Sequence, residues 1–172
     1  MPGFAQALPT ILRSEGGYVD DPVDRGGATN FGITQKTYDA WRVKNQLGKV
    51  SVRDIATDEV EAIYHTRYWS AAKCDALPWP ASLCHFDASV NHGPRNAAKL
   101  LQRVVGVTPD GKIGPQTLGA VSRTPAYKLT TGLLFGRIAF YVKIVGARPS
   151  QIKFLRGWIR RVLHLWEETE TA

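Results

Sequence analysis

Apolar side chains recur at helical spacing from the first residues of the chain. Phe4, Leu8 and Ile11 repeat at intervals of three and four residues. This spacing predicts an amphipathic helix over residues 4–15. Pro9 interrupts the pattern, and it either kinks this helix or occupies the first turn of a helix that begins near Leu8.

The same periodicity predicts helices through most of the remaining sequence. Thr34 is a favourable N-terminal cap for the first of them. Glycine and proline separate later helices from one another, most clearly at Gly93-Pro94. The expected helices follow Thr34 and Thr57 and then cover residues 83–92, 95–105, 116–122, 126–145 and 150–168. Together with the first helix they make about eight.

Residues 16–33 break the helical pattern. They contain five glycines, one proline and three aspartates, which no stable helix accommodates. Short strands around residues 18–19 and 28–33, joined by a turn at 21–27, fit this composition best. We therefore expect a mainly α fold of the α+β type, with a small β-hairpin after the first helix.

Length and composition describe an ordinary globular protein. The chain has 172 residues, of which 44% are hydrophobic and 22% are charged, as expected for one domain. No uninterrupted apolar run approaches the ~20 residues that a membrane helix needs, so no integral membrane segment is expected. The N-terminal residues lack the basic region and cleavage site of a signal peptide. This predicts synthesis in the cytoplasm, and we expect a monomer.

Neither the cysteines nor the histidines follow a metal-binding or disulfide pattern. Cys74 and Cys84 are too few for a disulfide framework and are not spaced as a C-x-x-C site. We expect buried thiols, with a single disulfide bond as the alternative. His85, Asp87 and His92 could be drawn as a zinc site, but no H-E-x-x-H or comparable motif supports it. No metal or organic cofactor is expected.

Basic residues are concentrated in the C-terminal part of the chain, whose formal net charge is +7. Residues 1–122 carry 13 basic and 12 acidic side chains, whereas residues 123–172 carry nine basic and three acidic ones. Such a surface attracts anionic polymers, among them nucleic acid, anionic lipid and bacterial cell wall. Residues 100–121 could form a helix-turn-helix, but the second helix lacks base-reading Arg or Lys. Nucleic acid is therefore not an expected partner.

The last expected helix combines an apolar stripe with basic side chains that lie mostly off the stripe. The stripe either packs against the domain or lies on a membrane surface. Among the basic side chains, we expect Arg156, Arg160 and Arg161 to attract anionic surfaces.

Acidic and glycine residues gather around the first helix end and the expected hairpin. Glu15 lies in the last helical turn, where the negative end of the helix dipole disfavours an ionised carboxylate. A carboxyl group that keeps its proton near neutral pH is what a general acid needs. A hairpin that folds back over the helix end would bring Asp24 and Thr29 close to Glu15. One protonated and one ionised carboxyl group are the working pair of a glycosidase.

The same residues also have purely structural explanations. Glu15 could be a surface residue at a helix end, and Asp24 could simply form a turn together with Asp20 and Asp21. Taken together, their spacing favours the functional interpretation over the structural one.

The segment around these residues resembles a known enzyme family. The sequence EGGYVDDPVDRGGATNFGIT, residues 15–34, is similar to the signature of glycoside hydrolase family 108, which comprises lysozyme-like muramidases. The resemblance implies a lysozyme-like fold and a catalytic role for Glu15, the first residue of EGGY. Phage-type lysozymes have Glu, Asp and Thr at nearly this spacing, which implies that Asp24 and Thr29 belong to the site. Tyr18 of EGGY becomes a candidate substrate contact.

The resemblance continues beyond the catalytic motif. Residues 86–94, FDASVNHGP, and 100–121, LLQRVVGVTPDGKIGPQTLGAV, are similar to the part of this family that leads into and forms a peptidoglycan-binding segment. We therefore divide the chain into a lysozyme-like catalytic part, 1–93, and a helical peptidoglycan-binding part, 94–172, packed together in one compact unit.

The resemblance implies a peptidoglycan hydrolase of the endolysin type, an N-acetylmuramidase. It would cleave the β-1,4 bond between N-acetylmuramic acid and N-acetylglucosamine, with Glu15 protonating the leaving oxygen. Asp24 would stabilise positive charge on the sugar or, with Thr29, position water. Two alternatives stay open, a lytic transglycosylase and a non-catalytic wall-binding or secretion-accessory protein. The expected place of action is the cell wall or periplasm after release.

Two polar residues in the helix at 83–92 are further candidate substrate contacts. Asp87 and Asn91 are four residues apart, so they share one helix face. They either hydrogen-bond sugar at the floor of the cleft or form a buried polar pair that orders the core. Peptidoglycan strands are the expected partner, and the basic C-terminal part would hold the anionic wall.

Overall fold

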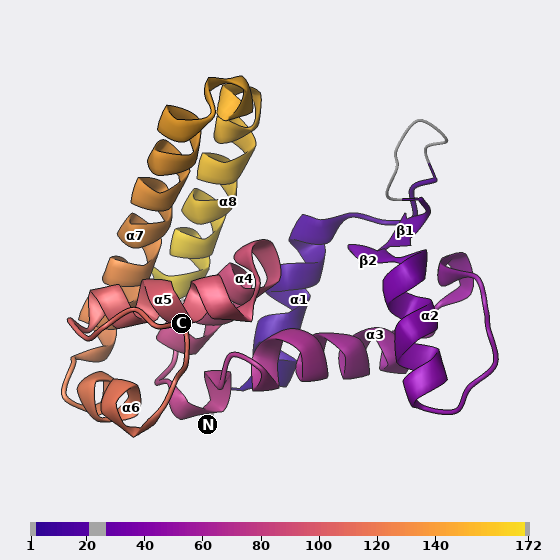
Figure 1. Ribbon diagram of the computed structural model, residues 1–172, viewed down its shortest axis with the longest axis horizontal. Coiled ribbons are helices and arrows are strands. Elements are labelled where there is room, and N and C mark those ends of the chain that lie inside the picture. Colours follow the sequence, from indigo (N-terminus) through magenta and orange to yellow (C-terminus); the bar gives the residue numbers. More distant parts are fainter. Residues whose placement is uncertain (1–2, 21–26, 171–172) are drawn as a thin grey trace.

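Eight α-helices and one two-stranded hairpin make up residues 3–20 and 27–170, which the computed structural model describes (Figure 1). The mainly α prediction, with a small hairpin after the first helix, is confirmed. The helices are α1 Phe4–Glu15, α2 Gln35–Lys44, α3 Thr57–Tyr64, α4 Ala81–His92, α5 Pro94–Val104, α6 Pro115–Ser122, α7 Ala126–Ala147 and α8 Ile152–Glu170, and the strands are β1 Thr29–Asn30 and β2 Ile33–Thr34. Short helical turns lie at η1 Val52–Asp54, η2 His65–Ser70, η3 Cys74–Ala76 and η4 Pro149–Gln151.

Helix α1 is continuous through its proline. It begins at Phe4, with Pro9 inside the helix, so the alternative start near Leu8 is wrong. Its inner face is fixed by Leu8 and Ile11, which are buried. The helix ends at Glu15 because Gly16 takes a positive φ of 76°, a conformation that favours glycine.

The β-hairpin is shorter and differently paired than predicted. Strand β1 pairs with β2, and Val19 adds only an isolated bridge to Thr29. The stretch expected to form one strand instead turns back on itself at Phe31 and Gly32, whose φ angles are 49° and 69°. Two successive positive φ angles form a two-residue hairpin turn, which the sequence analysis did not recognise. Thr34 caps α2 as predicted, accepting a hydrogen bond from the Thr37 N–H.

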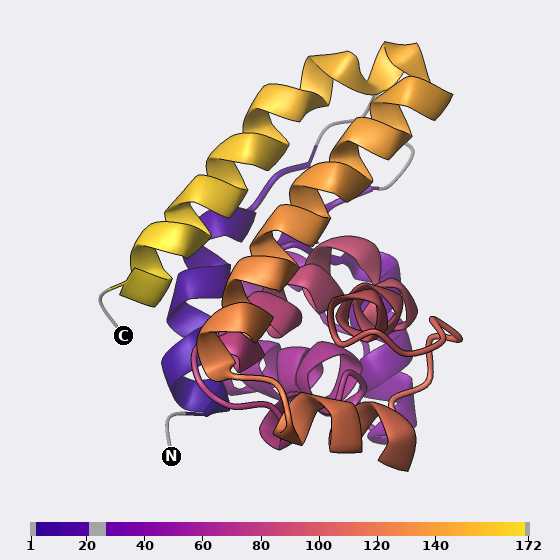
Figure 2. The ribbon, with the colours of Figure 1, turned by 90° about the vertical axis from the view of Figure 1, so that its left-hand side faces the viewer.

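Helix α4 forms the centre of the molecule. Its first nine residues are all buried, and it packs against α1, α5 and α7. Helices α7 and α8 lie side by side and extend away from the other helices, and α8 also contacts α1 (Figure 2). The hairpin and α2 lie at the opposite end of the molecule from α7 and α8 (Figure 1). Helix α8 is therefore placed to meet the end of α1.

Helix α7 is apolar enough to raise the question of a membrane span. By length and composition it could cross a membrane, with a mean hydropathy of 1.3. About 33% of this stretch is buried inside the protein, and it carries the fully buried Arg137.

Cys74 and Cys84 are both buried and unpaired, as the first of the two alternatives predicted.

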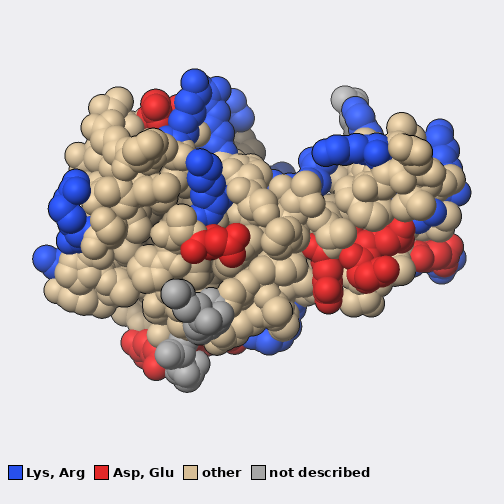
Figure 3. All heavy atoms as spheres, turned by 90° about the horizontal axis from the view of Figure 1, so that it is seen from below, with Lys and Arg blue, Asp and Glu red and all other residues tan. Residues whose placement is uncertain are grey.

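Charge is unevenly distributed over the surface. On the face shown in Figure 3, acidic side chains form a band over the half of the molecule that carries α2 and α3. In the sequence, residues 123–172 carry three times as many basic as acidic side chains, nine against three. The basic excess therefore belongs to α7, α8 and the turns around them.

Candidate active site

Glu15 lies where the end of α1 meets the hairpin turn. Its side chain is 18% exposed. A Cβ atom added to Gly32 would lie 2.6 Å from Glu15 Oε2, and Gly32 has a φ of 69°, so both the close approach and the backbone favour glycine here. The Tyr64 hydroxyl donates a hydrogen bond of 2.7 Å to the Phe31 carbonyl and holds the turn in place. The hairpin therefore folds back over the helix end, as the sequence predicted.

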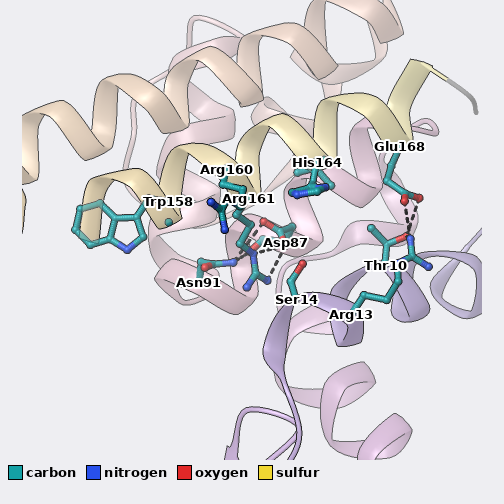
Figure 4. Close-up of a pocket in the computed structure, with 12 residues that line it drawn as sticks. Thr10, Arg13, Ser14, Asp87, Asn91, Trp158, Arg160, Arg161, His164 and Glu168 are labelled. Atoms are coloured by element: carbon teal, nitrogen blue, oxygen red, sulfur yellow. Dashed lines mark hydrogen bonds and ion pairs between the residues drawn. The ribbon is translucent and has the colours of Figure 1, made fainter. Parts of the chain in front are cut away.

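Arg161 of α8 is the ionic partner of Glu15. Its Nη1 atom lies 2.6 Å from Glu15 Oε1. The same guanidinium donates from Nε and Nη2 to Asp87 Oδ1, at 2.9 and 2.7 Å. Figure 4 shows Arg161 pointing from α8 toward Asp87. One side chain in the middle of α8 thus joins the end of α1 to the middle of α4.

A second arginine holds Asp87 from the other side. Arg137 of α7 forms an ion pair with Asp87 Oδ2, and both side chains are buried. Burial alone would raise the pKa of Asp87, but Arg137 and Arg161 outweigh it and hold that pKa below its ordinary value. Arg137 also donates to the Tyr141 hydroxyl at 2.9 Å. Asp87 therefore remains ionised and anchors two arginines.

This network corrects one expectation about the basic tail. Arg161 was expected to belong to an exposed cationic set with Arg156 and Arg160. It is only 16% exposed, and Glu15 and Asp87 take up its donors. Its position on α8 faces α1 and α4, whereas Arg156 and Arg160 are exposed. Arg161 thus belongs to the candidate site and not to the exposed set.

A pocket lies beside this network, between α1, α4 and α8. Its volume is about 510 Å³, and its lining includes Ser14, Asp87, Asn91 and Trp158 (Figure 4). Asn91 donates to the Asp87 carbonyl at 2.9 Å and to Asp87 Oδ2 at 3.3 Å. The Asp87 carboxylate is buried and occupied by arginines, whereas Asn91 is exposed in the pocket lining, so the two do not form a buried pair. Contact of Asn91 with sugar stays a prediction.

The other predicted site residues are placed less directly. Asp24 lies outside the described residues. Thr29 is partly buried in β1, where its backbone pairs with Val19 and Thr34. Tyr18 is 37% exposed, its hydroxyl donates to Asp20 at 3.3 Å, and the Arg53 guanidinium lies over its ring.

Three residues of the site were missed by the sequence analysis: Gly32, Tyr64 and Arg161. Gly32 had a usable signal, because N-F-G-I in a glycine-rich segment is compatible with a tight turn. Tyr64 had no signal of its own, because it lies in a helix whose apolar pattern already explains it. Arg161 had no local signal, because its partner Glu15 lies at the other end of the chain.

The residues present do not suggest a metal centre. Across residues 3–20 and 27–170, no group of three His, Cys, Asp or Glu side chains is arranged to hold a metal ion. His85 faces the Ala72 carbonyl at 3.1 Å, and burial lowers its pKa to about 4.

Comparison with known proteins places the chain in a family. The sequence model of glycosyl hydrolase 108 matches residues 8–93, and that of a predicted peptidoglycan domain matches residues 96–163. The comparison with curated proteins gave no match. A solved structure of Brucella abortus SagA is similar, with a TM-score of 0.81 and 36% sequence identity over 98% of this chain and 94% of that one. This agrees with the expected lysozyme-like fold. The chain therefore belongs to glycosyl hydrolase family 108, and it is a glycoside hydrolase directed at peptidoglycan.

Proposed function

We propose that the protein is an N-acetylmuramidase with Glu15 as its general acid. The bond cleaved is the β-1,4 linkage between N-acetylmuramic acid and N-acetylglucosamine. The observation that carries this proposal is the position of Glu15, partly exposed and pressed against the hairpin turn at Gly32. The family match supports the class of reaction, and the geometry of Glu15 supports its role as the acid.

The two oxygens of Glu15 have different surroundings. Oε1 is held by Arg161, whereas Oε2 is the atom nearest to the position that a Cβ on Gly32 would take. Within the residues that the structure describes, Oε2 has no hydrogen-bond partner. Arg161 therefore orients the carboxyl group, and Oε2 faces the hairpin turn. A glycosidic oxygen bound beside the turn would receive the proton from this atom.

Asp24 and Thr29 complete the proposed mechanism. Asp24 stabilises the positive charge that develops on the sugar or, with Thr29, positions the attacking water. Thr29 is in β1, two residues before the Phe31–Gly32 turn that touches Glu15. This proximity in the chain supports a position of the Thr29 hydroxyl in the same cleft as Glu15. Direct attack by water would invert the anomeric configuration.

The site of action and the role of the tail remain parts of the same proposal. The protein is made in the cytoplasm and reaches the wall after release. The basic excess of residues 123–172 supports attraction to the anionic wall through exposed side chains such as Arg156 and Arg160. The proposed monomer needs a single copy of the site.

The products formed from purified peptidoglycan test this function. We expect new reducing ends of N-acetylmuramic acid, detected by borohydride reduction and mass spectrometry. Anhydromuramyl ends would show a lytic transglycosylase instead. Sedimentation of the protein with walls, without any soluble product, would show a binding protein. Either of these two results contradicts the muramidase proposal.

A further inference from the structure

A second cavity lies between α5 and α7, away from Glu15. Its volume is about 810 Å³. Helix α5 crosses α7 (Figures 1 and 2), and the groove lies in the angle between them. Its lining residues repeat at intervals of three and four along each helix, so one face of each helix forms one wall. Apart from His92 at the end of α4, the lining residues belong to residues 94–147, outside the stretch that matches the glycoside hydrolase.

The floor of the groove is apolar and closely packed. A Cβ atom on Gly136 would lie 2.6 Å from Leu100, and one on Gly132 would lie 2.6 Å from Val104. These two glycines let α7 approach α5 closely. Phe135 also lines the groove, although it is 56% exposed. A large exposed aromatic side chain on a groove wall is available to a ligand.

The rim of the groove is cationic. Lys99 and Arg103 line it from α5, and Lys128 and Lys143 line it from α7. None of the lining residues is Asp or Glu. Across residues 3–20 and 27–170, no ion pair involves any of these four cations. Four unpaired positive charges around an apolar floor complement a ligand with several carboxylates and small apolar groups.

We propose that this groove binds the acidic stem peptide of peptidoglycan. The stem peptide carries carboxylate groups on a backbone with alanine methyl groups, which matches the cationic rim and the apolar floor. The match of residues 96–163 to a predicted peptidoglycan domain favours this occupant over an anionic lipid. The inference rests on the proposed function for its substrate class. It adds a second site, which binds the peptide, whereas Glu15 acts on the glycan.

Peptide binding is measured directly, without catalysis. The probe is a synthetic stem tetrapeptide, L-Ala-γ-D-Glu-diaminopimelate-D-Ala, titrated by calorimetry and followed by NMR shifts of α5 and α7. The test variant combines Lys99→Gln, Lys128→Gln and Lys143→Gln. The matched control combines Lys36→Gln, Lys44→Gln and Lys49→Gln, three lysines outside the groove that lower the net charge equally.

We expect the test variant to bind the peptide about eightfold more weakly than wild type. Each of the three partly exposed charge contacts contributes about twofold to the affinity, and the three factors multiply. The control should bind as wild type does. Ala139→Glu places a carboxylate in the groove and should also weaken binding, whereas Ala147→Glu, at the end of the same helix, should not. Equal loss in the test and control triples would overturn the inference.

Two further probes separate this site from its competitors and from the proposed function. Vesicles with anionic phospholipid should bind the test and control triples equally. A selective loss of vesicle binding, with peptide binding unchanged, would assign the groove to lipid and contradict the proposal. Peptide-free glycan strands should be hydrolysed equally by wild type and the test triple. Peptide binding without any hydrolysis would refute the muramidase and leave this site intact.

Discussion

Replacing Arg161 with Gln tests whether the last helix belongs to the catalytic machinery. In the structure, Arg161 donates twice to Asp87 and contacts Glu15. The variant removes the cation and keeps most of the side-chain length. We expect lower stability, because Asp87 loses a partner, and lower turnover, because Glu15 is no longer oriented.

The size of the stability loss follows from the burial of the network. Removing one partner of a buried ion pair costs about 3–5 kcal/mol when the other partner is left uncompensated. Asp87 keeps Arg137 in this variant, so we expect the lower end, about 3 kcal/mol. In a chain of 172 residues, this lowers Tm by about 6–12 °C.

The expected kinetic effect is separate from the loss of stability. Misplacing a catalytic group by about 1 Å can cost about 100-fold in rate. We therefore expect kcat on a soluble glycan fragment to fall about 10- to 100-fold, with KM nearly unchanged. The assay is run at 25 °C, well below Tm, with circular dichroism to show that the variant is folded.

Arg156→Gln is the matched control. Arg156 is another arginine of α8, it is exposed and does not line the pocket, and no ion pair involves it among residues 3–20 and 27–170. The control changes net charge equally and should keep both Tm and kcat on the fragment. Arg161→Lys keeps the positive charge but lacks the planar guanidinium group, so it should retain part of the activity. If Arg161→Gln is folded and turns over the fragment as fast as Arg156→Gln, the positioning role is refuted.

The remaining predictions concern the hairpin, the water-positioning residues and pH. Gly32→Ala should reduce kcat at least about tenfold, because its Cβ would meet Glu15 Oε2; unchanged kcat contradicts the close approach. Asp24→Asn and Thr29→Ala should lower kcat more than they raise KM, measured on soluble fragments. The pKa of His85 falls to about 4 on burial. The unfolded chain therefore binds more protons than the folded chain between pH ~6.5 and ~4. We expect Tm to fall as the pH is lowered through this range, and to fall less in His85→Asn.

The sequence predicted the helices well because their signals are local. Apolar spacing located α1, and Gly93-Pro94 marked the junction between α4 and α5. Thr34 capped α2 for the reason given, a side-chain oxygen that accepts from the first turn. The start of α1 was left open because Pro9 weakens the local signal, whereas burial of Ala7 and packing of Phe4 against the core favour the earlier start.

The site was only partly predictable because its contacts are distant in sequence. Glu15 could be found, since it lies in a motif and at a helix end. Arg161 is 146 residues away and reaches Glu15 only because α8 packs beside α1. In the sequence, nothing distinguishes Arg161, which belongs to the ion-pair network, from its exposed neighbour Arg160. Asp87 was chosen for its helix face, but only the structure showed that two arginines occupy its carboxylate.

The rate of Glu15→Gln on purified peptidoglycan tests the proposed mechanism most directly. Gln keeps the size of the side chain and its hydrogen-bonding capacity toward Arg161, but it cannot donate a proton as an acid. We expect native circular dichroism, wall binding equal to wild type, and release of reducing muramic acid ends slowed at least about 100-fold. A folded Glu15→Gln variant that releases these ends at the wild-type rate would show that Glu15 is not the general acid.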